Sequence, residues 1–380
     1  MYLKDIGEFG LIERFRGKIR TDRSVFMGSG DDCAVLKLDG FRYQLFTCDM
    51  IVEDIDFTEK DSMRDVGRKA LGISISDIAS CGGIPRHAVI SLGLPKNMRL
   101  SQAELLAKGV FDLAKKFKIN IVGGDISASG KIIIDVSMLG EVEKGKLCLR
   151  RGARPGDIIM VTGSFGGSIK GKHLKFIPRL KEARFLADNF KVNSMIDVSD
   201  GLIQDLGHIL EQSSVGAVLY EGLIPLSREA KNTQEALCSG EEFELLFTVS
   251  REQANRIIKS SRYSFKVIGE IMPEKFGLRL IDHKSRYSKI KFSSSARTGR
   301  SGKAGDYAEV RTGRSGKAGY CAGVRAGRSD KTGYSAEART GRSGKAGYCA
   351  GVRAGRSDKT GYSAEARTGR SFKAGYRHFQ

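Results

Sequence analysis

The sequence contains no tryptophan, only six prolines and no uninterrupted apolar run long enough to cross a membrane. A membrane-spanning helix needs about 20 predominantly apolar residues, so a spanning helix is excluded. The opening residues Met1–Asp5 also lack the apolar stretch of a signal peptide. We therefore expect a soluble, cytoplasmic protein with no membrane partner.

Cysteine is scarce and scattered. Five of the seven cysteines lie in the first 240 residues without any Cys-x-x-Cys spacing, and the other two lie in repeats. Zinc sites and the disulfide frameworks of small secreted domains need closely spaced cysteines, so both are disfavoured. The pattern favours free thiols in a reducing compartment.

The excess of positive charge is concentrated at the C-terminal end. Of the net charge of +20, residues from Ala296 onward contribute 19 Lys and Arg against 6 Asp and Glu. The rest of the chain is close to balanced, so charge is an argument about the tail alone. A chain of 380 residues with 40% apolar content is long enough for two or three domains with real cores.

A 14-residue unit repeats in tandem from Ala296 through Phe379, and residues 324–337 recur letter for letter at 352–365. The units are rich in glycine and hold hardly any leucine, isoleucine or phenylalanine. They offer too little apolar surface to offset chain entropy, so we predict a disordered, low-complexity tail over 293–374. The alternative is a basic segment that binds RNA, and nucleic acid would then be contacted only through this tail.

Helix and strand signals alternate before the tail. Ser101–Glu104 matches a capping box, and Ser250–Gln253 matches another helix start. The predicted elements are helices over 101–117 and 251–260, and strands at 119–122, 132–139 and 158–161. The turn-rich segment Arg151–Asp157 separates two such series. We place a boundary near residue 145, which gives one domain over 1–145 and a second over 146–292.

Several aspartates stand at the ends of apolar runs, and all but Asp49 have glycine or serine within two positions. They are Asp31, Asp32, Asp49, Asp77, Asp125, Asp197 and Asp200. Loops at strand ends carry ligands in α/β folds, so these side chains are candidates for one site. Taken singly, each is a turn residue or a helix cap as readily as a ligand. Ser199 or Asp200, for example, is placed to cap a helix that contains Leu202 and Leu206.

If these carboxylates converge, they require cations. Two carboxylates about 4 Å apart repel by roughly 4 kcal/mol at an effective dielectric of 20. Sites built only of oxygen ligands select hard ions, and Mg²⁺ commonly combines a few carboxylates with phosphate oxygens. The pattern therefore predicts a site for Mg²⁺ and a nucleotide.

A glycine-lysine phosphate loop does not account for the nucleotide. The nearest match, Gly166–Lys172, is followed by His173 where a phosphate loop has serine or threonine. No dinucleotide-binding glycine motif, protein-kinase catalytic loop or nucleophile elbow is present in the sequence. ATP would then be held by aspartates and metal.

Seven separate motifs occur in a fixed order along the chain. They are Gly28–Leu36, Thr47–Glu53, Arg68–Ala79, Val122–Asp125, Arg151–Asp157, Met195–Leu202 and Ser239–Phe247. Together they resemble the thiamine-monophosphate kinase family, within the superfamily of aminoimidazole ribonucleotide synthetase and selenophosphate synthetase. The resemblance spans about residues 4–292. It implies an α/β (α+β) fold with two aminoimidazole ribonucleotide synthetase-like domains, a homodimer joined through N-terminal strands, and ATP-dependent conversion of thiamine monophosphate to thiamine diphosphate.

The resemblance also implies roles for individual residues. It assigns Asp32, Asp49, Asp77, Asp125 and Asp197 to Mg²⁺, with Thr47 and Cys48 at a metal-adjacent turn and Asp200 at a further ion. Gly124, Asp125, Arg150 and Ser199 would contact ATP. Asp49, Asp125 and Arg150 would be the catalytic residues, and Asp56, Glu241 and Tyr376 would lie on the substrate side.

Some positions depart from the family pattern. Asp56 stands where the family usually has a substrate-contacting histidine, Cys48 replaces a usual threonine, and Glu242–Phe243 replaces Asp-Tyr. A carboxylate at Asp56 would repel a phosphate unless a metal intervenes. The end of the chain, residues 375–380, matches the aromatic substrate motif that commonly closes the family, but Gly375 and Tyr376 equally continue the repeat. Both interpretations stay open.

The expected chemistry needs few catalytic groups. A phosphate acceptor is already ionised near neutral pH, so direct in-line attack on the γ-phosphorus of ATP requires no general base. The alternative function is a catalytically impaired member of the superfamily, or a scaffold whose basic tail binds RNA. The reactive N-terminal residue of selenophosphate synthetase and the C-terminal cysteine of the hydrogenase-maturation member are both missing from this sequence.

Overall fold

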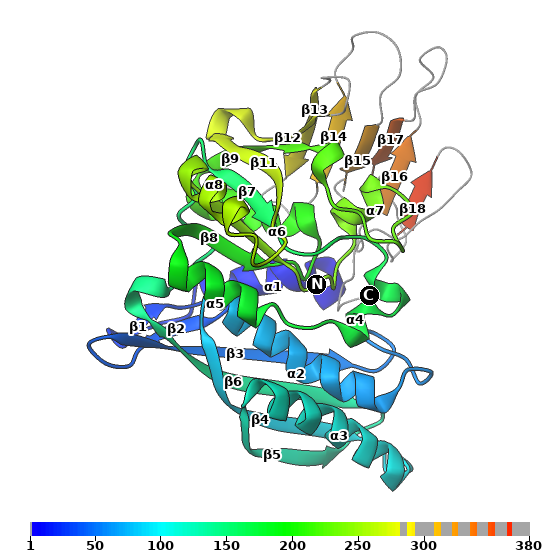
Figure 1. Cartoon of the computed structure of the whole chain (residues 1–380). Coiled ribbons are helices and arrows are strands. Elements are labelled where there is room, and N and C mark those ends of the chain that lie inside the picture. Colours follow the sequence, from blue (N-terminus) through cyan, green and yellow to red (C-terminus); the bar gives the residue numbers. More distant parts are fainter. Residues whose placement is uncertain are drawn as a thin grey trace.

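The computed structural model describes residues 2–281 and, beyond them, six strands named β13 to β18. Two large sheets lie one above the other, with helices between and around them (Figure 1). Short helix α1 (Gly7–Arg16) precedes the first sheet. Within the described residues, no helix has the length and apolar character needed to cross a membrane. The mixed α/β class expected from the sequence is confirmed.

The first sheet has the order β1-β2-β3-β6-β4-β5 and is antiparallel except for the β4–β5 pair. Its strands are β1 (Val25–Met27), β2 (Ala34–Lys37), β3 (Arg42–Val52), β4 (Ile84–Leu94), β5 (Asn120–Ala128) and β6 (Ile133–Glu143). Buried and half-buried residues alternate along β6, as in a sheet with one face on the core. Helices α2 (Met63–Ser80) and α3 (Leu100–Phe117) contribute to that core.

Glycine allows α2 and α3 to cross closely. A Cβ atom at Gly67 would lie 2.1 Å from the backbone oxygen of Leu106, and one at Gly109 would lie 1.9 Å from that of Arg64. No other residue type fits either position without moving a helix. The crossing fixes α2 on the inner side of the first sheet, facing the second (Figure 1).

The second sheet has the order β14-β13-β12-β9-β11-β7-β10-β8. Its strands before the repeats are β7 (Ile158–Val161), β8 (Val192–Asp197), β9 (Val215–Tyr220), β10 (Leu245–Val249), β11 (Lys266–Pro273), β12 (Leu278–Ile281) and β13 (Tyr287–Phe292). The helices of this half are α4 (Lys172–Lys175), α5 (Leu180–Asn189), α6 (Leu202–Ser213), α7 (Thr233–Cys238) and α8 (Arg251–Ser260). Alternate residues of β7 enter two different cores, one with α6 and α7 and one with α5 and α8. Both faces are therefore covered, which explains the unbroken apolar run at 158–161.

The sequence predictions for individual elements hold in part. Strand 158–161 and helix 251–260 are confirmed with their bounds, and the Ser250 hydroxyl accepts a hydrogen bond from the backbone N–H of Gln253. The Ser101 capping box is wrong, because α3 begins at Leu100 and its N-cap residue is Arg99. The first sheet ends at Glu143 and the second begins at Ile158. These limits lie on either side of the boundary proposed near 145, and the division into two domains stays a prediction.

Parts of the repeats are described as strands. Strand β14 (Ala308–Thr312) pairs with β13, and a separate sheet of order β15-β17-β16-β18 contains β15 (Cys321–Arg325), β16 (Ser335–Arg339), β17 (Cys349–Arg353) and β18 (Ser363–Ala366). Its parallel pairs join equivalent residues of the 28-residue period, such as Cys321 and Cys349. The disorder that the sequence favours over 293–374 stays a prediction. The rest of the repeats and residues 375–380, with Tyr376, lie outside the described residues.

Candidate active site

Helix α2 holds acidic side chains against strand β3. The Ser74 hydroxyl donates a hydrogen bond to Oδ2 of Asp49 at 2.8 Å, and the Thr47 hydroxyl donates one to Oδ2 of Asp77. Thr47 and Asp49 are two residues apart on β3, so both side chains point to the covered face of the first sheet. Three of the predicted metal residues are thus brought together here. Asp77 lies within a helix and Asp49 within a strand, and neither is at a strand end as the sequence suggested.

The same helix reaches the second sheet. The Ser76 hydroxyl donates to Oδ2 of Asp197 at 2.6 Å, and Asp197 is the last residue of β8. The neighbouring serines Ser74 and Ser76 therefore each hold one aspartate, from opposite halves of the chain. Neither serine was singled out from the sequence, although both stand in the motif that contains Asp77.

Asp32 joins this group from the segment before β2. Its Oδ1 accepts a hydrogen bond from Nε of Arg150 at 2.8 Å, and Arg150 also approaches it through Nη2. Its Oδ2 is buried and has no hydrogen-bond partner among the residues that the structure describes. Asp31 beside it accepts from the backbone N–H of Arg150 at 3.1 Å. A buried carboxylate oxygen without a partner is costly unless a cation meets it.

Burial and mutual repulsion disfavour the ionised forms of these aspartates. Burial, followed by the charge of Asp32, raises the pKa of Asp197 to about 8 and that of Asp31 to about 7. Burial likewise raises the pKa of Asp49 to about 6. Burial, with Asp49 and Asp197 nearby, raises the pKa of Asp77 well above its ordinary value. Such shifts are expected where carboxylates gather without enough positive charge.

We call Asp32, Asp49, Asp77 and Asp197 the aspartate cluster. Among the described residues, Arg150 is the basic side chain that binds the aspartate cluster, and it does so through its ion pair with Asp32. The candidate ligand atoms are all carboxylate oxygens, and Oδ2 of Asp32 has no hydrogen-bond partner among the described residues. This set fits Mg²⁺, a hard cation that prefers oxygen ligands.

Asp200 lies beside two residues that sequence reasoning missed. Ligand atoms of Asp200, Asp205 and His208 all lie within 4.8 Å of one another. The Asp205 carboxylate accepts hydrogen bonds from the backbone N–H groups of Asp200 and Gly201, at 3.1 and 3.0 Å. Helix α6 has Gly201 as its N-cap residue without a side-chain cap, so neither Ser199 nor Asp200 is the cap. Asp205 and His208 are one turn apart on α6, the spacing that places two side chains on one face.

Asp125 and Cys48 lie elsewhere. Asp125 is exposed within strand β5, in register with Ser91 of β4, which is itself in register with Asp135 of β6. Cys48 is exposed, and its thiol donates to Asp135 at 3.2 Å. The expected metal-adjacent turn at Thr47 and Cys48 is wrong, because both residues lie inside strand β3 and their side chains point to opposite faces. Gly124 precedes Asp125 in β5, where a Cβ atom would lie 1.9 Å from the backbone oxygen of Ile90.

The predicted substrate residues Asp56 and Glu241 meet through Lys69 of α2. Nζ of Lys69 donates to both carboxylate oxygens of Glu241, at 2.6 and 2.7 Å, and to the backbone oxygen of Asp56 at 2.7 Å. The Asp56 carboxylate accepts from the backbone N–H of Val52 at 2.7 Å, within the turn that follows β3. This carboxylate is therefore buried and bound within its own turn.

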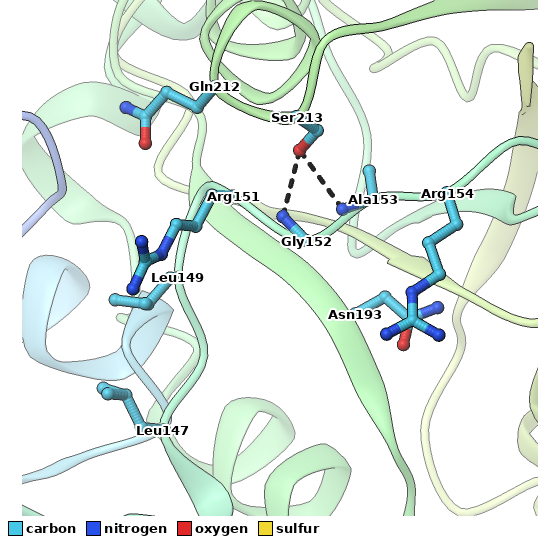
Figure 2. A pocket seen from close by; sticks show the side chains of 9 residues that line it. All are labelled: Leu147, Leu149, Arg151, Gly152, Ala153, Arg154, Asn193, Gln212 and Ser213. Atoms are coloured by element: carbon cyan, nitrogen blue, oxygen red, sulfur yellow. Dashed lines mark hydrogen bonds between the residues drawn. The ribbon is translucent and has the colours of Figure 1, made fainter. Parts of the chain in front are cut away.

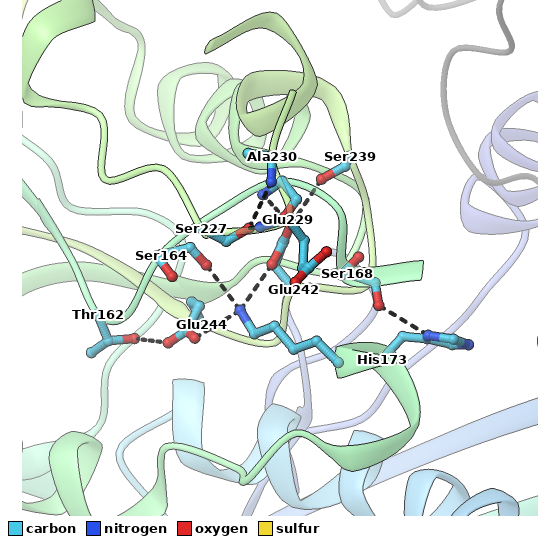
Figure 3. A network of polar contacts seen from close by, with 12 residues as sticks. Thr162, Ser164, Ser168, His173, Ser227, Glu229, Ala230, Ser239, Glu242 and Glu244 are labelled. Atoms are coloured by element: carbon cyan, nitrogen blue, oxygen red, sulfur yellow. Dashed lines mark hydrogen bonds and ion pairs between the residues drawn. The ribbon is translucent and has the colours of Figure 1, made fainter. Parts of the chain in front are cut away.

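Two further acidic side chains lie in the same loop as Glu241 (Figure 3). Nζ of Lys172 binds Glu242 at 2.8 Å and Glu244 at 2.9 Å, and Arg179 binds both oxygens of Glu244. Burial alone would raise the pKa of Glu244, but Arg179 and Lys172 outweigh it and hold the pKa below its ordinary value. Lys172 is therefore engaged in ion pairs, and Gly166–Lys172 is not a phosphate loop.

A pocket of about 440 Å³ lies beside the segment that joins the two sheets (Figure 2). It is lined by Leu147, Leu149, Arg151, Gly152, Ala153, Arg154, Asn193, Gln212 and Ser213. The Ser213 hydroxyl accepts from the backbone N–H groups of Gly152 and Ala153. Gln212 donates to the backbone oxygen of Gly30, so the pocket adjoins the loop that carries Asp31 and Asp32.

Two sheets joined across a buried aspartate cluster define the class of protein, which is that of the AIR synthase related proteins. The N-terminal domain of that family matches residues 30–142, and its C-terminal domain matches residues 154–281.

Individual relatives indicate one family within this class. The chain is 35% identical to the thiamine-monophosphate kinase of Bacillus subtilis (strain 168) over 275 residues, which are 65% of this chain and 84% of that protein. It is also 35% identical to that of Rhodopirellula baltica over 285 residues, which are 70% of this chain and 89% of that protein. A solved structure described as AaThiL complexed with AMPPCP and TMP superposes with a TM-score of 0.66 at 30% identity, over 74% of this chain and 95% of that one. The chain belongs to the thiamine-monophosphate kinase family.

Proposed function

We propose that this protein transfers the γ-phosphate of ATP to thiamine monophosphate and so forms thiamine diphosphate. The observation that carries the proposal is the aspartate cluster, in which side chains from both halves of the chain gather with too little positive charge of their own. Membership of the thiamine-monophosphate kinase family supports the choice of substrates.

Mg²⁺ belongs to this proposal. Asp32, Asp49, Asp77 and Asp197 would hold it, and it would supply charge neutralisation and alignment for the phosphates of ATP. Asp200, with Asp205 and His208 beside it, would hold a further ion. We also retain the proposal that Asp125 binds metal and ATP. Within one chain, Asp125 lies on the opposite face of the first sheet from Asp49.

The residues of this chain have three tasks in the reaction. Arg150, which is fixed by its contact with Asp32, and Ser199 would orient ATP. Ser74 and Ser76 hold the Asp49 and Asp197 carboxylates in place by hydrogen bonds. The loop around Glu241 would position thiamine monophosphate. No side chain has to remove a proton, because the attacking phosphate oxygen is already ionised near neutral pH.

The test is turnover with purified full-length protein. We expect ADP release in the presence of Mg²⁺ to depend on thiamine monophosphate and to match thiamine diphosphate formation mole for mole. ADP release that is the same without thiamine monophosphate would identify an ATPase instead. No ADP release under either condition would favour the catalytically impaired alternative.

We also propose a homodimer that forms through the open face of the first sheet. Apolar side chains on that face are unusually exposed for strand residues, among them Phe46 (42%), Met50 (54%) and Val89 (39%). Contiguous exposed apolar surface on a sheet commonly marks a protein interface. Met50→Asp should halve the mass measured by light scattering, whereas an unchanged mass would place any interface elsewhere.

A reducing cytoplasm is proposed as the location, because the five cysteines within residues 2–281 are free thiols. RNA binding by the basic tail remains the second candidate function. The concentration of positive charge from Ala296 onward favours it. Truncation after residue 295 should remove RNA binding if the tail is responsible, and unchanged binding would exclude the tail.

A further inference from the structure

Lys69 is a lysine whose charged group is completely buried. Its side chain is 0% exposed, and Nζ lies within hydrogen-bonding distance of three acceptors, which are the two carboxylate oxygens of Glu241 and the backbone oxygen of Asp56. A lysine ammonium has three hydrogens to donate. All three are used by the protein, so Lys69 has none left for a phosphate.

The three acceptors come from segments that are distant in sequence. Asp56 belongs to the turn after β3 in the first half, and Glu241 belongs to the loop between α7 and β10 in the second. Lys69 therefore fastens that loop, residues 239–244, onto the first half. We call these residues the 239–244 loop.

The 239–244 loop has a strained backbone that needs such support. Glu241 and Phe243 have positive φ angles of 59° and 49°, in the left-handed region that side chains disfavour. The backbone N–H of Glu241 donates to the oxygen of Ser199 at 2.6 Å, and that of Phe243 to Val198 at 2.8 Å. The conformation is thus held on one side by the segment that follows Asp197 and on the other by Lys69.

The position of Lys69 on α2 indicates what the loop serves. Lys69 precedes Asp77 by eight residues, which is roughly 12 Å along a helix with a rise of about 1.5 Å per residue. Between them, Ser74 and Ser76 bind Asp49 and Asp197. A molecule whose phosphate lies at the aspartate cluster and whose organic part extends along α2 would reach the Lys69 end. ATP would be held at the other end, near Arg150.

A purely stabilising role explains Lys69 less well. Buried ion pairs often add no net stability over apolar side chains of similar size, because desolvation offsets the attraction. They do fix geometry. His173 lies close enough for the Lys69 charge to act with burial in lowering its pKa, so the neighbourhood contains a neutral imidazole rather than a second cation.

We propose that Lys69 is a positioning residue that sets the affinity for the phosphate acceptor by holding Glu241 and the Asp56 turn in register. The proposal rests on the proposed function, since it takes thiamine monophosphate as the acceptor. It adds a residue whose effect is confined to one of the two substrates.

The test compares steady-state kinetics of Lys69→Met with those of Arg184→Met. Arg184 also pairs across the two halves, with Glu143, but at a distance from the 239–244 loop. For Lys69→Met we expect a KM for thiamine monophosphate at least tenfold higher, with the KM for ATP changed less than twofold. Arg184→Met should leave both KM values unchanged, and Lys69→Arg should recover part of the lost affinity because it keeps the charge.

Other outcomes overturn the proposal. Equal increases in both KM values, or a lower kcat with both KM values unchanged, would reduce Lys69 to a structural role. If Lys69→Met does not fold, Glu241→Gln weakens the same contact and is measured in the same way, and an unchanged KM for thiamine monophosphate there would contradict the proposal. Wild-type protein is measured first. An absence of turnover that depends on thiamine monophosphate would reject the proposed function and not the role of Lys69.

Discussion

Two buried acidic groups lie in this protein, and they differ in their compensation. Glu241, Glu242 and Glu244 each bind a lysine or arginine of the chain, and the pKa of Glu244 stays below its ordinary value despite burial. In the aspartate cluster the pKa values of Asp49, Asp77 and Asp197 are instead raised, mainly by burial, and Oδ2 of Asp32 has no hydrogen-bond partner among the described residues. The chain supplies its own cations to the first group but little positive charge to the second, which is why we propose that the second binds Mg²⁺.

Whether a buried carboxylate has a basic partner in the chain indicates whether it serves the structure or the function. A compensated carboxylate holds a loop in place, and its loss should reduce stability. An uncompensated carboxylate is a cost in the free protein that is recovered when a cation binds. Removing it should therefore raise the stability of the free protein and abolish activity.

The largest expected effect is on turnover. Asp49→Asn removes a charge from the aspartate cluster while keeping the size of the side chain and its hydrogen bond with Ser74. We expect kcat to fall by about a thousandfold, the magnitude seen when a group that stabilises the transition state is removed. Circular dichroism should show an unchanged fold. Near-normal turnover would mean that the cluster is not the catalytic centre.

The compensated group should respond through stability. Lys172→Met leaves Glu242 and Glu244 without one of their cations, and both side chains are almost fully buried. We expect a loss of about 3–5 kcal/mol in the free energy of unfolding, measured with urea. Lys175→Met is the matched control, because its pair with Asp65 is exposed and 3.5 Å long. It should cost less than about 1 kcal/mol, and equal losses in the two variants would break the comparison.

Within the aspartate cluster, a substitution should change the free energy of unfolding in the opposite direction. Asp197→Asn removes a carboxylate whose pKa is raised to about 8 by burial and Asp32. In metal-free buffer at pH 7 we expect the free energy of unfolding to rise by about 1–3 kcal/mol. Glu244→Gln, in the compensated group, should lower it. A loss of stability in both variants would show that the two groups are alike.

A further expected effect is a dependence of stability on pH. Asp49, Asp31 and Asp197 have pKa values of about 6, 7 and 8 in the folded protein, against an ordinary value of 3.8. The folded state therefore binds more protons than the unfolded state between about pH 4 and pH 8, so these groups lower stability as pH rises through that window. Urea unfolding of metal-free protein at pH 5.5 and pH 8 should show the decline. A rise in stability that Asp197→Asn leaves unaltered would contradict it.

The sequence predicted which aspartates converge better than it predicted the elements that carry them. The aspartates of the cluster were identified because each lies beside an apolar run, and the expected convergence is found for Asp32, Asp49, Asp77 and Asp197. Their assignment to strand ends was wrong for Asp49 and Asp77. The stretch around Ser74 and Ser76 alternates like a strand, but the close α2–α3 crossing at Gly67 and Gly109 requires a helix.

Long-range pairs account for what could not be predicted. Lys69 and Glu241 are 172 residues apart, and nothing in either local pattern indicates the partner. The face of a strand that becomes covered is also set by other elements, which is why Asp125 could not be separated from the buried aspartates by its motif alone. The local sequence pattern predicts which residue types belong to the site. Which of these residues contact one another depends on tertiary packing, which the local pattern does not contain.

The most direct test of the central claim is the response of stability to Mg²⁺. The free energy of unfolding of wild-type protein and of Asp197→Asn would be measured by urea titration with and without Mg²⁺, at a concentration near 100 times the dissociation constant found for wild type. The account predicts a gain of about 2.7 kcal/mol for wild-type protein and a much smaller gain for Asp197→Asn. Equal gains, or none in the wild type, would contradict it.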